Sequence, residues 1–84
     1  MKKLLCGKVT HFFPKIGVAV IELSRELKLG ERLSFEGATT DFMQPVESMQ
    51  VDKKEVASAP RGQQIGVKVQ GRARAGDSVY KLVE

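Results

Sequence analysis

Side chains suited to catalysis are scarce in this chain, which has a single histidine, His11, and a single cysteine, Cys6. A cysteine or serine nucleophile needs a base beside it, and both would have to share His11. No serine lies in the Gly-x-Ser-x-Gly pattern of a nucleophile elbow. One histidine and one cysteine also leave a zinc site two ligands short. We therefore expect no catalytic residue and no metal, and we expect Cys6 to be a small apolar residue of the first strand.

Loops that bind nucleotide phosphates are equally absent. A phosphate-binding loop needs glycine-rich backbone followed by Lys and Ser or Thr, and neither Gly30-Glu31-Arg32 nor Gly37-Ala38-Thr39 supplies that order. The chain has no Gly-x-Gly-x-x-Gly either. We expect no GTP binding and no cofactor, and we expect that the chain is not an enzyme.

Basic side chains are the strongest sign of a binding function. Fourteen Lys and Arg residues outnumber ten Asp and Glu residues, which gives a net charge of +4 and favours an anionic partner. The candidate RNA-binding residues are basic and lie in the second half of the chain: Lys53, Lys54, Arg61, Lys68, Arg72 and Arg74. If the first and last strands are neighbours, several of them can share a face with the lysines at positions 2, 3 and 8. The alternative is scattered surface charge, because acidic residues are interleaved.

An aromatic pair follows the histidine. In a regular strand, only one of Phe12 and Phe13 can point into the core. The other would be exposed, and an exposed ring beside basic residues can stack on an unpaired base.

Apolar residues recur at every second position, which predicts an all-β fold. Ile16, Val18 and Val20 alternate with small residues, as do Ile65, Val67 and Val69. We expect six strands, over residues 3–12, 16–23, 32–36, 40–51, 64–70 and 78–83. Pro45 should lie at an edge or a bulge of the fourth strand. One extra residue there would allow both Val46 and Met49 to be buried.

Two turns repeat one pattern, in which glycine and an acidic residue precede a strand. These are Gly30-Glu31 and Gly76-Asp77. Glycine supplies a positive φ, and the carboxylate can accept backbone N–H groups. Residues 24–27 and 53–56 could each form one helical turn, too short to carry a function.

The length of 84 residues predicts one domain, residues 1–84. A single cysteine permits no internal disulfide, which suits a reducing cytoplasm. The apolar run after Lys3 ends at Gly7, too soon for a secretory leader, and no stretch is long enough to span a membrane. We expect a soluble, cytoplasmic protein without a membrane partner.

Five segments in order resemble the β-barrel second domain of translation elongation factors of the EF-Tu type. They are Gly7-Lys8-Val9 with 16–20, Leu27-Lys28-Leu29-Gly30-Glu31, residues 46–51, Ala59-Pro60-Arg61-Gly62 with 65–67, and Ala75-Gly76-Asp77-Ser78-Val79. The segment 9–19 is also similar to the C-terminal barrel of collagenase-like peptidases.

The resemblance implies a small six-stranded Greek-key β-barrel and, from the elongation factors, contact with tRNA or the ribosome. By position, Gln50 matches a glutamate that packs on the terminal adenosine, and Lys53 matches a basic residue near the acceptor stem. Lys68 stands where the family has an apolar pocket residue. The implied function is a non-catalytic RNA-binding module. The alternative is an accessory protein-interaction barrel that works with a separately encoded peptidase-like or RNA-modifying enzyme.

Overall fold

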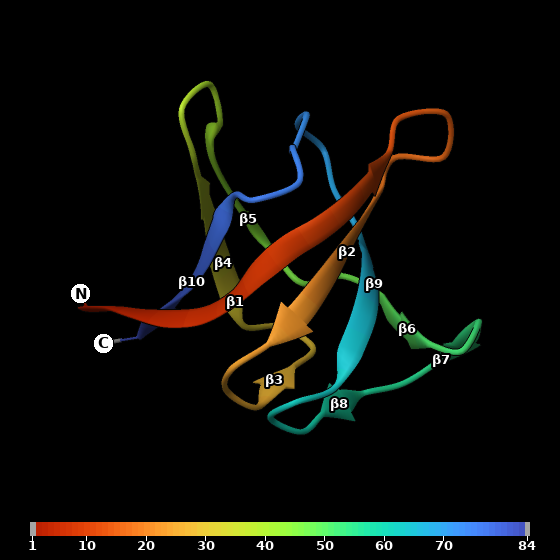
Figure 1. The fold of residues 1–84 in the computed structure, drawn as a ribbon. Helices are drawn as coiled ribbons and strands as arrows, with labels where there is room; N and C mark the ends of the chain where they lie inside the picture. Colours follow the sequence, from red (N-terminus) through yellow and green to blue (C-terminus); the bar gives the residue numbers. More distant parts are fainter. Residues whose placement is uncertain (1, 84) are drawn as a thin grey trace.

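A computed structural model describes residues 2–83, and all of the regular structure in this range is β (Figure 1). The strands are β1 (Lys2–Phe13), β2 (Val18–Leu23), β3 (Leu27–Lys28), β4 (Arg32–Glu36), β5 (Asp41–Pro45), β6 (Met49–Val51), β7 (Lys54–Glu55), β8 (Ser58–Ala59), β9 (Gln64–Lys68) and β10 (Ser78–Val83). None of the described residues belongs to a helix that would be long and apolar enough to cross a bilayer.

The main sheet has the order β5-β4-β10-β1-β2-β9-β6-β7, and β3 pairs with β8 in a small second sheet. Every pairing is antiparallel. β10 returns to lie between β1 and β4, which gives the non-sequential neighbours of a Greek key. The first and last strands are therefore neighbours, as expected, and Lys2 pairs with Val83 (Figure 1). Residues 2–8 of β1 pair with β10 and residues 7–13 pair with β2, and its two register shifts accommodate this long path around the barrel.

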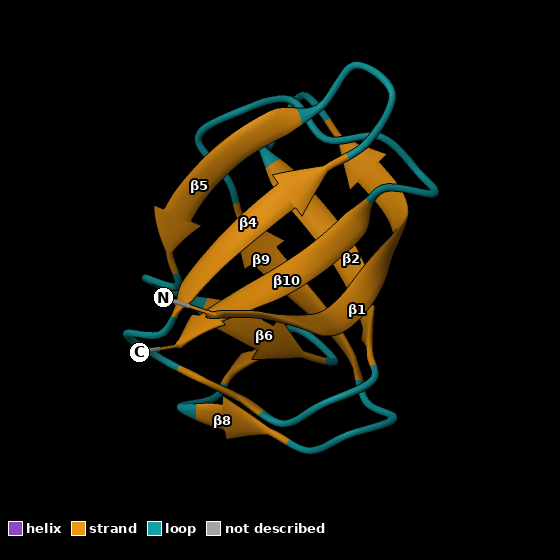
Figure 2. Ribbon diagram, turned by 90° about the vertical axis from the view of Figure 1, so that its left-hand side faces the viewer, coloured by secondary structure: helices purple, strands orange, loops and turns teal. Residues whose placement is uncertain are grey.

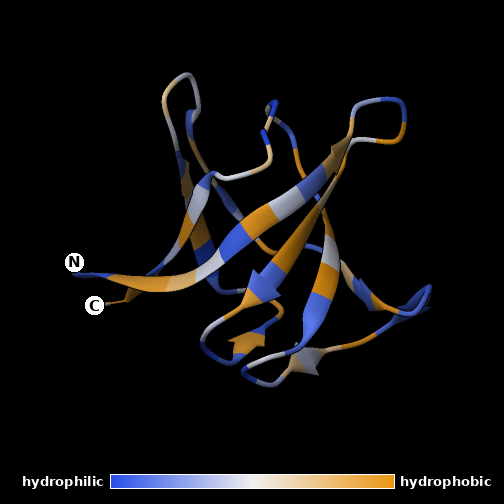
Figure 3. Cartoon of the chain, viewed as in Figure 1, coloured by the Kyte–Doolittle hydropathy of each residue, from blue (hydrophilic) through white to orange (hydrophobic). Residues whose placement is uncertain are grey.

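Inward-facing apolar side chains fill the barrel, and the all-β barrel predicted from the alternation is confirmed (Figure 2). Along β2, Ala19, Ile21 and Leu23 are buried, and Ile65 and Val67 continue the layer on β9. Figure 3 shows bands of differing hydropathy along β9, whereas β2 is apolar over most of its length. Phe35 lies at the centre of the opposite wall and stacks on Phe42 with the ring centroids 4.7 Å apart.

The predicted strand 40–51 is wrong in its continuity, because the chain leaves the sheet after Pro45. The backbone N–H of Val46 donates to Glu31 O, and the backbone N–H of Gly30 donates to Val46 O, so Val46 pairs with a turn. The separation of β5 from β6, and not a bulge within one strand, allows Val46 and Met49 both to be buried. Pro45 does lie on an edge strand, as expected, since β5 is the first strand of the sheet.

A side chain joins the edge strand β5 to the end of β9, where the strand ladder does not. Gln44 on β5 is 5% exposed and points inward. Its Nε2 donates to Lys68 O at 2.9 Å, and its Oε1 accepts the backbone N–H of Gln70 at 2.7 Å. A glutamine amide presents one donor side and one acceptor, as a peptide group does. Gln44 therefore takes the place of a missing strand pairing between β5 and the end of β9.

The glycine–acid turns have the geometry that was expected of them. Glu31 Oε1 accepts the N–H of Lys28, and Asp77 Oδ2 accepts the N–H of Arg74, each at 2.7 Å. Gly30 and Gly76 both have positive φ. The possible helical turns at 24–27 and 53–56 are wrong, because these residues contribute to the short strands β3 and β7 instead.

A third turn, Pro60-Arg61-Gly62-Gln63, follows the same path without an acidic residue. The backbone N–H of Gln63 donates to Pro60 O, and Gly62 has positive φ. Its first residue is proline, which has no N–H to satisfy. The acidic residue is thus found only in the turns whose first residue has an N–H that needs an acceptor.

Candidate functional site

The only histidine and the only cysteine are not arranged for catalysis. Cys6 is 0% exposed, and burial raises the pKa of its thiol, which disfavours the nucleophilic thiolate. It is a small apolar core residue, as predicted. His11 is exposed and stacks on Phe13, with the two ring centroids 6.2 Å apart. Within residues 2–83, no three His, Cys, Asp or Glu side chains gather closely enough to hold a metal ion.

The predicted RNA-binding residues do not form one cluster. Lys53 and Lys54 belong to the β6–β7 hairpin, and Gln50 pairs there with Glu55. The tip of this hairpin is strained, because Asp52 and Lys53 both have positive φ, which is unusual for residues other than glycine.

The other predicted residues lie elsewhere on the barrel. Arg61 lines a hollow beside Leu5 and Arg25, and Lys68 lines another beside Gln44. Arg72 and Arg74 alone share a hollow. The alternative, in which the basic residues are scattered over the surface among acidic ones, therefore describes this distribution better than a single basic patch does.

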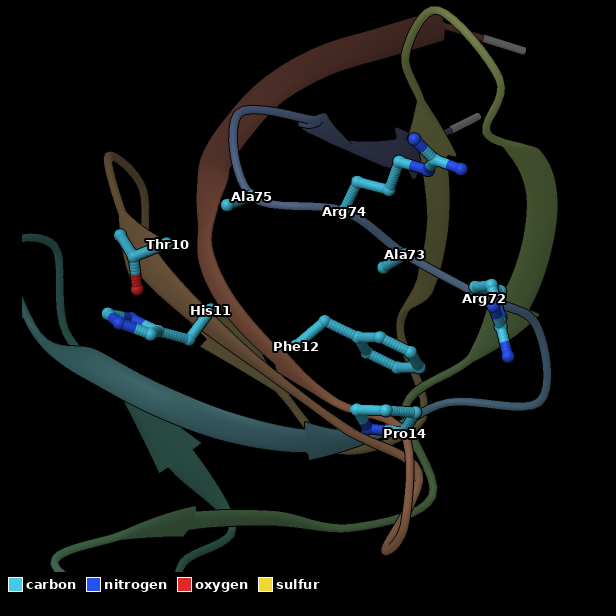
Figure 4. A pocket seen from close by; sticks show the side chains of 8 residues that line it. All are labelled: Thr10, His11, Phe12, Pro14, Arg72, Ala73, Arg74 and Ala75. Atoms are coloured by element: carbon cyan, nitrogen blue, oxygen red, sulfur yellow. The ribbon is translucent and has the colours of Figure 1, made fainter.

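The hollow that contains both arginines lies between the end of β1 and the loop that leads to β10. We call it the Phe12 hollow; it is lined by Thr10, His11, Phe12, Pro14, Arg72, Ala73, Arg74 and Ala75 (Figure 4). Phe12 packs partly against the core, and Phe13 is 46% exposed, so one ring of the pair points inward, as expected. Figure 4 shows the Phe12 ring between the two sides of the hollow, with Pro14 next to it. No acidic side chain lines the hollow.

A second exposed surface covers the outside of β1, β10, β4 and β5. Leu33, Phe35 and Val79 point into the core. The alternate residues of these strands therefore face outward. We call this surface the outer face; its side chains are Lys3, Leu5, Tyr80, Leu82, Arg32, Ser34, Glu36, Met43 and Pro45.

Four outward-facing positions lie side by side across the outer face and form a row. Met43 lies opposite Ser34, Ser34 opposite Tyr80, and Tyr80 opposite Leu5. Met43 is 67% exposed and Leu5 is 52% exposed, but Ser34 is polar and only 2% exposed. A hollow lined by Arg32, Met43, Gln44, Pro45 and Leu82 adjoins this row. The face combines large exposed apolar side chains with polar groups, as protein-binding surfaces do.

An ion pair crosses the outer face above Tyr80. Lys3 Nζ lies 2.7 Å from Glu36 Oε2 and 5.2 Å from the centroid of the Tyr80 ring. Ser34 Oγ donates to the same carboxylate at 2.9 Å. The hydrogen bond from Lys3, and then that from Ser34, lowers the pKa of Glu36, and the hydrogen bond to Glu36 raises the pKa of Lys3.

Analysis of the sequence missed the outer face and Gln44. Met43 lies between Phe42 and Gln44, whose side chains point inward, and alternation would have placed it outside had β5 been given its true end. Nothing in the sequence distinguishes Gln44 from a solvated glutamine, because its partners Lys68 and Gln70 are more than twenty residues away.

Two relatives match along almost the whole chain. An uncharacterized protease of Methanocaldococcus jannaschii is 40% identical over 84 residues, which is 99% of this chain and 21% of the relative. A collagenase of Porphyromonas gingivalis is 33% identical over 83 residues, 96% of this chain and 20% of the relative. The chain thus spans about a fifth of the length of these curated relatives. No family model matches the sequence.

Solved structures agree with this relationship. The crystal structure of the C-terminal domain of a Geobacillus thermoleovorans protein assigned to the U32 peptidases superposes with a TM-score of 0.88, covering 95% of this chain and 93% of that domain. Its selenomethionine variant gives a TM-score of 0.84 and covers 89% and 95%. Both are 20% identical to this chain. The fold is that of this peptidase C-terminal domain.

The expectation of a translation-factor function is overturned by these comparisons. The relatives carry protease and collagenase names, and the matching structure is a peptidase domain. The sequence resemblance to collagenase-like peptidases is the one that the comparisons support. The prediction of RNA binding, with tRNA or the ribosome as partner, was therefore wrong. Its physical basis was weak, because glycine turns and alternating apolar residues are features of the barrel and not of a ligand site.

Proposed function

We propose that this barrel is a non-catalytic accessory domain that binds a peptidase-like catalytic part. The observation that carries the proposal is the identity of 40% along 99% of the chain to a stretch making up only 21% of a protein named as a protease. A barrel that accounts for a fifth of such a protein leaves the remaining length to provide the chemistry. The burial of Cys6 and the exposure of His11 support a role in binding rather than catalysis. We further propose that the protein acts in the cytoplasm, on the basis of its single unpaired cysteine.

The outer face is the proposed docking surface for the catalytic part. Its exposed apolar side chains, Met43 and Leu5, supply area that is removed from water on binding. Burying an exposed methionine or leucine contributes roughly 1.5–3 kcal/mol each. Lys3 and Glu36, whose ion pair crosses the face, would fix the orientation of the partner more than the affinity.

The position of the outer face supports the same partner. In the Geobacillus protein the barrel is the C-terminal domain, so the rest of that protein precedes the first strand. Here the beginning of β1, at Lys2 and Lys3, lies beside β10 at one border of the outer face (Figure 1). A catalytic part that leads into such a strand would begin next to this face.

The proposal is tested by isolating the barrel from its source organism with bound proteins and identifying them by mass spectrometry. We expect a peptidase-like polypeptide to be retained by the native barrel and lost with Met43→Glu, which places a charge in the row across the outer face. Lys53→Glu is the matched control, because it adds negative charge on the β6–β7 hairpin and should retain the partner. Self-association through the outer face, or retention that is indifferent to Met43→Glu, would contradict the proposal.

A further inference from the structure

The Phe12 hollow lies on the barrel apart from the outer face, and its loop is firmly held. The side chains at 72–74 alternate, so that Ala73 is buried while Arg72 and Arg74 are exposed. The Arg74 N–H donates to Asp77 Oδ2, and the Gly76 N–H donates to Val9 O, each at 2.7 Å. The position of both arginine backbones is therefore fixed before any ligand arrives, which reduces the entropic cost of binding.

Close packing fixes the other end of the same loop. A Cβ on Gly71 would lie 2.7–2.8 Å from the Phe42 ring, so only glycine fits there. The preceding residue, Gln70, donates its N–H to Gln44 Oε1. The loop is therefore held on both sides of Arg72. The guanidinium of Arg72 makes no ion pair with any residue from 2 to 83.

The chemistry of the hollow selects its ligand. Two guanidinium groups attract an anion to a hollow that no acidic side chain lines, and the planar guanidinium matches a carboxylate through two parallel hydrogen bonds. Phe12 and Pro14 add an apolar floor (Figure 4). A ligand with a carboxylate next to an apolar side chain satisfies both features.

Neutral hydrogen-bonding groups are few in the hollow, which argues against recognition of a nucleobase. Thr10 offers a hydroxyl, but its Oγ1 already donates to Val20 O at 3.3 Å and accepts from Gln64 Nε2 at 3.1 Å. Base edges are read by such groups. An acidic peptide needs only the guanidinium groups and the apolar floor.

We propose that the Phe12 hollow binds an acidic peptide segment in which a carboxylate adjoins an aromatic or aliphatic side chain. Arg72 and Arg74 bind the carboxylates, and Phe12 packs against the apolar side chain. This site is separate from the outer face and does not depend on the catalytic part being present.

The test is a titration of the 84-residue chain, followed by amide chemical shifts, with acetyl-Asp-Phe-Asp-amide. We expect saturable shifts at Phe12, Gly71 and Ala73. Replacing Arg72 or Arg74 by Gln should weaken binding about three- to tenfold, since a charged hydrogen bond contributes roughly 1 kcal/mol or more and 1.4 kcal/mol is tenfold. Arg61→Gln, at another hollow, is the matched control and should leave the affinity unchanged.

Three further ligands make the result decisive. Acetyl-Asn-Phe-Asn-amide should bind at least tenfold more weakly, and acetyl-Asp-Gly-Asp-amide should lose the shift at Phe12. Uridine 5′-monophosphate should bind no better than inorganic phosphate. Equal binding of the Asn peptide, an equal effect of Arg61→Gln, or preference for the nucleotide would overturn the proposal. Because only the barrel is used, a failure here leaves the docking proposal standing, and a failure of docking leaves this result standing.

Discussion

Replacing Gln44 by alanine should open the barrel where β5 meets the end of β9. The side chain satisfies two backbone groups, the Lys68 C=O and the Gln70 N–H, and is almost fully buried. Leaving a buried polar group without a partner costs about 1–3 kcal/mol, so the loss of both bonds costs about 2–6 kcal/mol. At about 0.05–0.15 kcal/mol per residue, a chain of 84 residues has a total stability of about 4–13 kcal/mol. The substitution should therefore remove a large part of the stability.

Urea unfolding followed by far-ultraviolet circular dichroism measures this loss. With a slope of about 1 kcal/mol/M, the midpoint should fall by at least about 2 M. Gln50→Ala is the control, since Gln50 is exposed on β6 and its removal should change stability by less than about 0.5 kcal/mol. Hydrogen exchange adds a local measurement, in which the Gln70 amide is protected in the native chain and exposed in Gln44→Ala. Equal midpoints for the two variants, or an unprotected Gln70 amide in the native chain, would refute the reasoning.

Three further predictions concern strain, charge and thiol burial. Lys53→Gly should raise the free energy of unfolding by about 0.5–1 kcal/mol, because a positive φ costs lysine more than glycine; thermal unfolding checks it, and a decrease would contradict it. The lowered pKa of Glu36 means that its bond to Lys3 stabilises the fold above the ordinary value of 4.5 and is lost as the pH falls through the folded value. Unfolding measured across this range should show a weaker pH dependence for Glu36→Gln, and an unchanged profile would count against the ion pair. Cys6 should react with an aromatic disulfide reagent more than about a hundredfold faster in urea than in the native state, and fast native labelling would exclude its burial.

The fold was predictable where local rules and tertiary packing agree. Alternation predicted the buried face of β9. On β2 it was wrong, because the structure buries Ala19, Ile21 and Leu23, and the expected series Ile16, Val18 and Val20 lies on the other face. The glycine–acid pattern predicted the turns at Gly30 and Gly76 down to the carboxylate that accepts the N–H. Both features depend on residues that are neighbours in the sequence. Their prediction needed no knowledge of the rest of the chain.

The parts that could not be predicted depend on contacts between distant residues. The break after Pro45 arises because Val46 pairs with the turn at Gly30. The connection made by Gln44 depends on hydrogen bonds to the end of β9. The candidate RNA site failed for the same reason, since basic residues close in the sequence, such as Lys53 and Arg61, lie in different parts of the barrel. Arg72 and Arg74 share one loop, and Lys53 and Lys54 share the β6–β7 hairpin, so only residues close in the sequence came together.

The central claim, that the outer face binds a peptidase-like catalytic part, is tested most directly by photo-cross-linking in the source organism. A photoreactive phenylalanine analogue at position 43 reports contacts of the outer face, and the same analogue at position 53 reports the β6–β7 hairpin. We predict that position 43 cross-links to the catalytic segment of a peptidase-like polypeptide and that position 53 does not. Cross-links from position 43 to unrelated proteins only, or equal cross-linking to the peptidase-like polypeptide from both positions, would contradict the account.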